Sequence, residues 1–339
     1  MAWNIFGHEW AAALLERHLA AGELRHAYLF TGPPGVGRRT LALRFAQAIN
    51  CARSPAPGES CGACRLCLQT WQMQQADLSV VQPETEAAAI KVEQVRELQR
   101  ALALSPYEAR YRVALLLDFQ QATASAQNAL LKTLEEAPAR VVLLLAANTP
   151  ESLLPTITSR CEILRLRPAP LARLTLALQQ RLGISAEDAR LLAHLSGGRL
   201  GYAMRMHGDP HLLEQRQAWL DDLRALLSAS RRERFAYAES ITRGRDRLAL
   251  KTNLAEMYQV WLSFWRDLLL VAAGSTAPLV NLHLQSELHD LIADVDIAAA
   301  RACAAGLEQA LDRLDANLNM QLLTEVVLLD WPRLARSDS

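Results

Sequence analysis

Residues 31–42 read TGPPGVGRRTLA, and this stretch decides the fold class that the sequence predicts. A phosphate-binding loop follows the pattern G-x-x-x-x-G-K-[ST], in which the glycines let backbone N–H groups face the phosphates. The preceding segment AYLFT (27–31) is typical of a strand, and TLALRFAQAI (40–49) has the apolar periodicity of a helix. Strand, loop and helix in this order predict a phosphate-loop α/β domain. The glycines that match the pattern are Gly32, Gly35 and Gly37.

This loop lacks the two residues that carry its chemistry. Arg38 stands where a lysine should reach the phosphate oxygens, and Arg39 stands where a Ser or Thr hydroxyl should bind Mg²⁺. Thr40 comes one residue late, and one residue turns a helical side chain by about 100°, so Thr40 cannot simply replace that ligand. Only three of the 36 basic residues are lysines, so a general preference for arginine is an alternative explanation for Arg38. That preference does not explain Arg39.

Length, charge and hydropathy limit the classes of protein. A chain of 339 residues suggests two or three domains. The 36 basic residues balance 36 acidic ones, so the protein has no bulk attraction to nucleic acid or to an anionic membrane. The longest apolar runs, such as LLLVAA (268–273), are far shorter than the roughly 20 residues that span a bilayer. With no visible signal peptide, we expect a cytoplasmic protein that makes no membrane contact.

Four cysteines lie close together with the spacing C-x9-C-x2-C-x2-C. Four thiolates can surround Zn²⁺ in a closed tetrahedral site, which is a structural rather than a catalytic arrangement. Disulfides and an iron-sulfur cluster are the alternatives, although a cytoplasmic chain would keep the thiols reduced. The predicted zinc ligands are Cys51, Cys61, Cys64 and Cys67, whereas Cys161 and Cys303 stand alone as small apolar residues.

A second motif of phosphate-loop ATPases is also incomplete. RVALLLD (112–118) is a buried strand of the parallel type that ends at Asp118, the position at which such a strand delivers an acid to the Mg²⁺ shell. Phe119 follows, where a water-activating glutamate is common. A helix, ATASAQNALLKTLEEAP (122–138), and another buried strand, RVVLLLAANTP (140–150), come next. This succession predicts a doubly wound sheet with helices on both faces.

Several segments together resemble the clamp-loader branch of the AAA+ proteins. They are HAYLFTGPPGVG (26–37), the four-cysteine insertion, ALLLDFQQATASAQNALLKTLEEAP (114–138) and LLLAANTPESLLPTITSRC (143–161). The resemblance covers about residues 5–165 and is weaker from there to the C-terminus. NALLKTLEE combined with the downstream SRC is highly specific, whereas the phosphate loop alone would not be.

The resemblance implies roles for particular residues. Positions 32–39 correspond to the nucleotide loop, Asp118 to the acid of the second motif and Asn148 to the polar residue that senses the γ-phosphate. Arg160, within Ser159-Arg160-Cys161, corresponds to an arginine that reaches the ATP site of the neighbouring subunit. Gly201 falls where the motor relatives carry a nucleotide-contacting arginine in their lid, with Arg199 nearby.

The rest of the chain is helical in pattern. Trp261, Phe264, Trp265 and Leu268 recur at helical spacing, which is typical of a core or a subunit interface. We expect an α/β AAA+ P-loop domain with a parallel sheet and a zinc-module insertion, followed by a small helical lid and an all-α C-terminal collar. The expected domains are 1–166, with the zinc module at 51–67, then the lid at 167–208 and the collar at 209–339.

We therefore expect a clamp-loader subunit that does not hydrolyse ATP, binds structural Zn²⁺ and offers Arg160 to a neighbouring ATPase. The implied partners are motor subunits of the gamma and tau type, a delta-type subunit, and through the complex the sliding clamp and primer-template DNA. The alternative is an active ATPase motor that uses Arg38 to clamp phosphate. Three departures from the ATPase motifs oppose it: Arg38 in place of lysine, Arg39 in place of Ser or Thr, and Phe119 in place of glutamate. A zinc-containing nucleic-acid binder fits the neutral charge poorly. Whether nucleotide binds without hydrolysis stays open.

Overall fold

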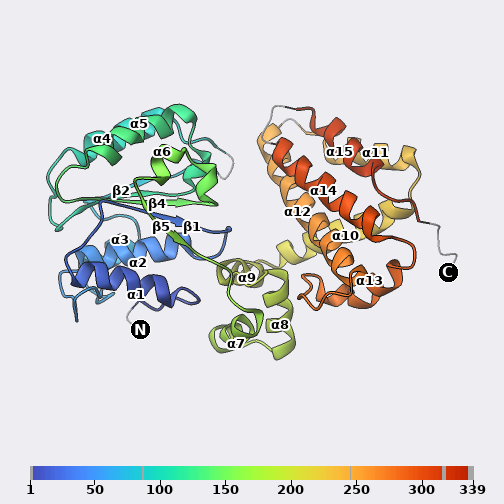
Figure 1. Ribbon diagram of the computed structural model, residues 1–339, viewed down its shortest axis with the longest axis horizontal. Helices are drawn as coiled ribbons and strands as arrows, with labels where there is room; N and C mark the ends of the chain where they lie inside the picture. The colour runs from blue at the N-terminus through green and yellow to red at the C-terminus, as the bar shows by residue number, and fades with distance from the viewer. Residues whose placement is uncertain (1–2, 86–87, 245, 315–317, 335–339) are drawn as a thin grey trace. The chain divides into compact units, whose positions relative to one another are not determined.

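The computed structural model describes residues 3–85, 88–244, 246–314 and 318–334 (Figure 1). The chain divides into two compact units. The first comprises Met1–Pro170 together with Gly198–Tyr202, and the second comprises Leu171–Gly197 together with Ala203–Ser339. No helix in the described part of the chain is long and apolar enough to cross a membrane.

The described part of the first unit holds a parallel sheet of five strands: β1 (Ala27–Thr31), β2 (Leu78–Val81), β3 (Arg112–Leu116), β4 (Val141–Ala147) and β5 (Glu162–Arg165). Their spatial order is β2-β3-β4-β1-β5. Every residue of β1, β3 and β4 is buried, as expected for a parallel sheet covered on both faces. Tyr28 and Phe30 of β1 enter one apolar core, and Ala27 and Leu29 enter another on the opposite face.

Helices cover the two faces of this sheet (Figure 1). On one side lie α1 (Glu9–Ala20), α2 (Arg38–Asn50) and α3 (Arg65–Trp71), and on the other lie α4 (Val92–Leu102), α5 (Ala124–Glu135) and α6 (Pro155–Thr158). Two short 3-10 turns, η1 (Phe119–Gln121) and η2 (Pro150–Ser152), follow β3 and β4. The α/β fold class predicted from the sequence is confirmed.

The boundaries of these elements differ from the sequence prediction by a few residues, for local reasons. The strand expected over 112–118 ends at Leu116 because Asp118 has a left-handed backbone with φ of 48°. The helix expected over 122–138 begins at Ala124, and the Thr123 side chain before it accepts the N–H group of Ala126, which has no partner within the helix. It ends at Glu135, ahead of a proline that disfavours helical backbone in the residue before it.

The regular elements in the described part of the second unit are all helices. They are α7 (Leu171–Leu182), α8 (Ala186–Leu195), α10 (Pro210–Ser228), α11 (Arg231–Ile241), α12 (Arg247–Ala272), η3 (Leu282–Leu284), α13 (Gln285–Leu291), α14 (Ile297–Leu314) and α15 (Met320–Leu329); α9 (Leu200–Gly208) begins in the first unit and ends in the second. The predicted aromatic stripe of α12 is confirmed as core, because Trp261, Phe264, Trp265 and Leu268 are fully buried.

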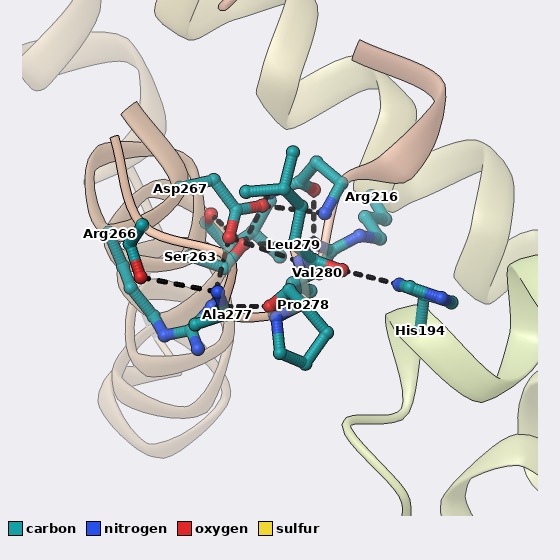
Figure 2. A network of polar contacts seen from close by, with 12 residues as sticks. His194, Arg216, Ser263, Arg266, Asp267, Ala277, Pro278, Leu279 and Val280 are labelled. Atoms are coloured by element: carbon teal, nitrogen blue, oxygen red, sulfur yellow. Dashed lines mark hydrogen bonds and ion pairs between the residues drawn. The ribbon is translucent and has the colours of Figure 1, made fainter. Parts of the chain in front are cut away.

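A polar network inside the second unit ties segments from three helices together (Figure 2). The fully buried carboxylate of Asp267 on α12 accepts backbone N–H groups from Val280 and Asn281 at 3.0 and 2.6 Å. In the same loop between α12 and η3, the Leu279 carbonyl accepts the Nδ1–H group of His194 from α8 at 2.6 Å. These contacts join α8 to the later helices within one unit, and the division into a lid at 167–208 and a collar at 209–339 stays a prediction.

Candidate functional site

The phosphate loop has the shape of a cradle between β1 and α2. Gly32, directly after β1, has φ of 147°, and a Cβ atom there would lie 2.5 Å from the carbonyl oxygen of Leu166. Gly35 at the tip has φ of 80°, in the left-handed region that other residues rarely adopt. Gly37 immediately precedes the first residue of α2. The backbone therefore keeps the course that requires glycine.

The guanidinium of Arg38 joins two side chains from other strands. Its Nη1 donates to Oδ1 of Asn148 at 2.7 Å, and its Nη2 donates to Oδ1 of Asp118 at 3.0 Å. Asp118 follows β3 and Asn148 follows β4, so the carboxyl ends of these strands and of β1 bring the three residues to one edge of the sheet. Of the three positions matched to nucleotide chemistry, Asp118 and Asn148 are therefore both hydrogen-bonded to Arg38.

Arg38 is only 8% exposed, whereas the side chain of Asp118 is 46% exposed. Burial lowers the pKa of Arg38, and the charge of Asp118 opposes that shift. An arginine nevertheless keeps its proton in a protein. The positive charge inside the loop is thus permanent and is already hydrogen-bonded to a carboxylate and an amide.

The remaining matched positions lie in other surroundings. Phe119 is fully buried in the core between the sheet and α5, so the residue after Asp118 faces away from solvent. Arg39 and Thr40 are exposed on the first turn of α2. The described residues bring no Ser, Thr or Glu side chain to the Arg38–Asp118–Asn148 cluster through a hydrogen bond.

The tip of the loop is covered by the short segment 198–202 of the same unit. The N–H group of Gly201 donates to the Gly35 carbonyl at 3.0 Å, and a Cβ atom on Gly201 would lie 2.8 Å from that oxygen. A Cβ atom on Gly35 would lie 2.8 Å from Tyr202. Gly201, the position matched to a nucleotide-contacting arginine, therefore packs backbone to backbone against the loop. Arg199 donates to the Pro34 carbonyl at 3.4 Å.

Arg160 lies at the opposite edge of the sheet from the phosphate loop. It lies between α6 and β5, two residues before the strand begins, and the amino ends of parallel strands share one edge. Its Nη2 contacts Oε1 of Glu135 at 2.8 Å, and its Nη1 donates to the Thr156 carbonyl at 2.9 Å. The arginine side chain is 35% exposed. Its neighbour Cys161 packs against the core, and burial raises the pKa of that thiol to about 12.

The four clustered cysteines fit a single metal ion. Their sulfur atoms all lie within 4.8 Å of one another, and those of Cys61 and Cys67 are 4.0 Å apart. Four sulfurs at about 2.3 Å from one tetrahedral ion would be roughly 3.8 Å apart, close to this spacing. Cys61 and Cys64 donate backbone N–H groups to Sγ of Cys51 and of Cys61. All four are free thiols, so the structure holds no disulfide here.

The cysteine module is attached to the sheet domain through α2. Cys51 ends that helix, and Cys64 precedes α3. The buried amide of Gln47 on α2 donates to the Cys67 carbonyl at 2.7 Å. The module is therefore joined to α2 by the chain at Cys51 and by a buried hydrogen bond at Cys67. Among the described residues, the candidate ligand group consists of the four cysteines.

Sequence reasoning missed two features of these sites. It took Arg38 as a lost lysine, or in the alternative as a phosphate clamp, and did not foresee that its guanidinium would bind Asp118 and Asn148. It also did not single out Glu135, the partner of Arg160, although both residues lie inside segments that carried the resemblance. The first signal was available, because the segments that end at Asp118 and Asn148 were predicted as parallel strands whose ends meet. No periodicity or spacing in the sequence indicates that Glu135 pairs with Arg160.

Comparisons with known proteins agree on one family. The family model described as DNA polymerase III, delta subunit, matches residues 7–170. The DNA polymerase III subunit delta' of Pseudomonas aeruginosa is 36% identical over 222 residues, which are 65% of this chain and 67% of that protein. The DNA polymerase III subunit delta' of Bacillus subtilis is 29% identical over 320 residues, and the match covers 93% of each chain.

Motor subunits are similar over a shorter stretch. The gamma/tau subunit of Mycobacterium bovis is 35% identical over 190 residues, which are 55% of this chain and 32% of that protein. The chain thus matches about a third of the length of this relative. Among solved structures, a gamma subunit-related protein from Thermotoga maritima has a TM-score of 0.46 at 18% identity, covering 95% of this chain and 97% of the other.

Proposed function

Because the chain belongs to the family of DNA polymerase III delta-prime subunits, we propose that it serves the clamp loader as a subunit that does not hydrolyse ATP. The family makes it a replication protein and a clamp-loader subunit of DNA polymerase III. The resemblance to clamp-loader AAA+ proteins stated from the sequence is thereby confirmed. The proposal concerns the division of labour: this chain supplies structure and one arginine, and a neighbour supplies ATP hydrolysis.

The observation that carries the proposal is the bonding of Arg38 to both Asp118 and Asn148. An ATPase needs the acid free to enter the Mg²⁺ shell and the polar residue free to meet the γ-phosphate. Here both are bound to a buried cation, and hydrogen bonds to charged groups contribute about 1.5–3 kcal/mol each. MgATP would have to replace these bonds without a lysine or a hydroxyl to form its own. Nucleotide binding is therefore opposed as well as hydrolysis.

The placement of Arg160 supports a role in a neighbouring site. Parallel strands keep it at the edge of the sheet away from the chain's own phosphate loop, and four strand residues span about 13 Å. An arginine offered in trans stabilises the charge on the transferring phosphoryl group and can raise the rate by about 10³-fold or more. Arg160 would play this part for a gamma/tau-type motor, with a delta-type subunit, the sliding clamp and primer-template DNA as further partners.

The four-cysteine module completes the proposal as a structural zinc site. Four thiolates and no open position favour Zn²⁺ without a catalytic role. Its attachment to α2, the helix that begins at Arg38, makes the module a brace for that part of the sheet domain. The iron-sulfur alternative uses the same ligands and is decided by metal analysis.

The lack of ATPase activity is tested on the purified full chain with MgATP. We expect no turnover above background, and no change on Asp118→Ala. Equilibrium titration with a fluorescent ATP analogue should likewise show no saturable binding in the concentration range in which motor subunits bind. Magnesium-dependent turnover that Asp118→Ala abolishes would overturn the proposal and favour the active motor that uses Arg38.

The role of Arg160 is tested in a complex reconstituted with gamma/tau and delta subunits. We expect Arg160→Ala to assemble normally and to lower the ATP hydrolysis that DNA and clamp stimulate, with partial recovery in Arg160→Lys because a point charge lacks the planar fork. Arg140→Ala is a matched control, since Arg140 is exposed and lies directly before β4 at the same edge of the sheet. Normal stimulated hydrolysis with Arg160→Ala would refute the role.

A further inference from the structure

We propose that Glu135 is a positioning residue that holds the Arg160 side chain folded back, so that the arginine extends only when a neighbouring site presents bound nucleotide. This inference rests on the proposed role of Arg160 and adds its regulation. The juxtaposition that carries it is the ion pair between the end of α5 and the turn after α6, at 2.8 Å.

Three acceptors hold the guanidinium of Arg160. Oε1 of Glu135 lies 2.8 Å from Nη2, the Thr156 carbonyl lies 2.9 Å from Nη1, and the Ser159 hydroxyl lies 3.4 Å from Nη1. Thr156 belongs to α6 and Ser159 directly precedes Arg160, so the side chain bends back over its own backbone. A side chain in this position does not use its full length, which an arginine acting in trans requires.

Glu135 differs from the other two acceptors because it comes from a different element and carries a charge. It is the last residue of α5, and its side chain is 51% exposed. The end of α5 is fixed by core residues of that helix, Leu130 and Leu134, which are buried against the sheet. The carboxylate is thus presented from a rigid helix to a guanidinium that comes from a short turn.

Because both side chains are partly exposed, the ion pair between Glu135 and Arg160 is weak and reversible. Ion pairs between exposed side chains are screened by water and contribute little. Bound nucleotide offers several negative charges and phosphate oxygens that a guanidinium can bind in pairs. A polyphosphate across the subunit interface can therefore compete successfully with one carboxylate. Glu135 sets the threshold at which Arg160 changes partners.

The consequence is a measurable bias against unstimulated hydrolysis. Removing Glu135 releases Arg160 to sample the extended arrangement before DNA and clamp arrive. In the reconstituted complex, we expect Glu135→Ala to raise the ATPase rate without DNA and clamp by about two- to five-fold, the range that corresponds to a surface ion pair. The stimulated rate should change much less, so the ratio of stimulated to unstimulated rates should fall.

Glu136→Ala is the matched control, because Glu136 is the adjacent exposed carboxylate. It removes the same charge from the same helix end and should leave both rates unchanged. A second control is Glu135→Ala combined with Arg160→Ala. Since the glutamate acts only through the arginine, the double variant should behave like Arg160→Ala alone, and a merely structural role of Glu135 would not give this result.

The outcomes separate this inference from the proposed function. If Arg160→Ala impairs hydrolysis but Glu135→Ala lowers the unstimulated rate, or matches Glu136→Ala, then Arg160 acts in trans and the restraint by Glu135 is wrong. If Arg160→Ala has no effect, the proposed function fails first and the inference fails with it. A rise in unstimulated rate that persists in the Arg160→Ala background would also overturn the inference, because the glutamate would then act through another group.

Discussion

Arg38 connects three segments that are far apart in the sequence, and its removal should be costly. In Arg38→Ala, the Asn148 amide and the Asp118 carboxylate lose a charged hydrogen-bond donor in a partly buried place. We expect the free energy of unfolding to fall by about 1–3 kcal/mol. Arg39→Ala is the control, because Arg39 is the adjacent exposed arginine on the same helix turn and should change stability by less than about 0.5 kcal/mol. Urea denaturation of both variants provides the measurement, and equal effects would contradict the structural importance of the cluster.

The same residue shows what a sequence can and cannot predict. The replacement of lysine by Arg38 is visible by comparison with a pattern, so loss of the ordinary chemistry was predicted. The new bonds span 80 and 110 residues of chain, and their existence depends on how deeply the guanidinium is buried, which no local pattern encodes. For Arg160 the motif predicts a function in trans, but the folded-back side chain follows from tertiary placement of α5 beside α6.

The cysteine module should depend on metal for its structure. The described module contains a single short helix, α3, so little apolar packing replaces the bonds that a metal would supply. We expect one Zn²⁺ per chain. Cys64→Ser should lose this metal, and its module should become sensitive to proteolysis, because the free energy of metal binding stabilises the folded module. Cys161→Ser should keep its metal. Zinc-free protein with four titratable thiols in the module, or iron in place of zinc, would contradict the assignment.

A carboxylate anchors the loop that leads into β3. Asp77 is buried, and its two oxygens accept N–H groups from Tyr107, Glu108 and Ala109 at 2.6–2.9 Å. Burial alone would raise the pKa of Asp77, but these donors outweigh it and the net shift is downward. A carboxylate with a lowered pKa in the folded chain stabilises the fold when the pH is above its pKa in the unfolded chain, near 3.9. This stabilisation is lost as the pH falls through the pKa of the folded chain.

Asp77→Asn should therefore be less stable than the natural chain at neutral pH, by about 1–3 kcal/mol, since an amide offers these N–H groups a weaker acceptor. The difference should shrink once the pH falls below about 4, where the natural carboxyl group also becomes protonated. Denaturant titrations at a series of pH values measure this difference. A gap that stays constant down to pH 3 would show that charge is not what holds the loop.

At the scale of the whole molecule, the sequence predicts the class of each unit better than it predicts how the helices of the second unit assemble. Buried parallel strands and amphipathic helices have periodicities that follow from burial, and so the α/β first unit and the helical second unit were both expected. The assembly of the second unit was not, because it depends on polar groups without periodic signals. Asp267 and Arg216 bind Asn281 from α12 and α10, and nothing in their spacing distinguishes them from surface charges.

Arg234 is another buried polar residue of the helical unit, and replacing it tests what that unit contributes to assembly. It is 4% exposed, and its guanidinium donates to five backbone carbonyls at or just beyond the C-terminal ends of α10 and α15. Helix C-termini leave carbonyls without partners and attract cations, so this arginine closes the ends of α10 and α15 together. The carbonyl oxygens belong to Leu226, Leu227, Leu328, Trp331 and Pro332.

Arg234→Met keeps the length of the side chain but removes every donor, leaving these carbonyls in an apolar setting. We expect a loss of about 3 kcal/mol in the free energy of unfolding and a smaller fraction of the chain recovered in the complex with gamma/tau and delta subunits. Arg231→Met is the control, because Arg231 is exposed on the same helix. If the helical unit forms the proposed collar, recovery should fall only with Arg234→Met. Normal recovery despite the lost stability would mean that the sheet unit alone carries the chain into the complex.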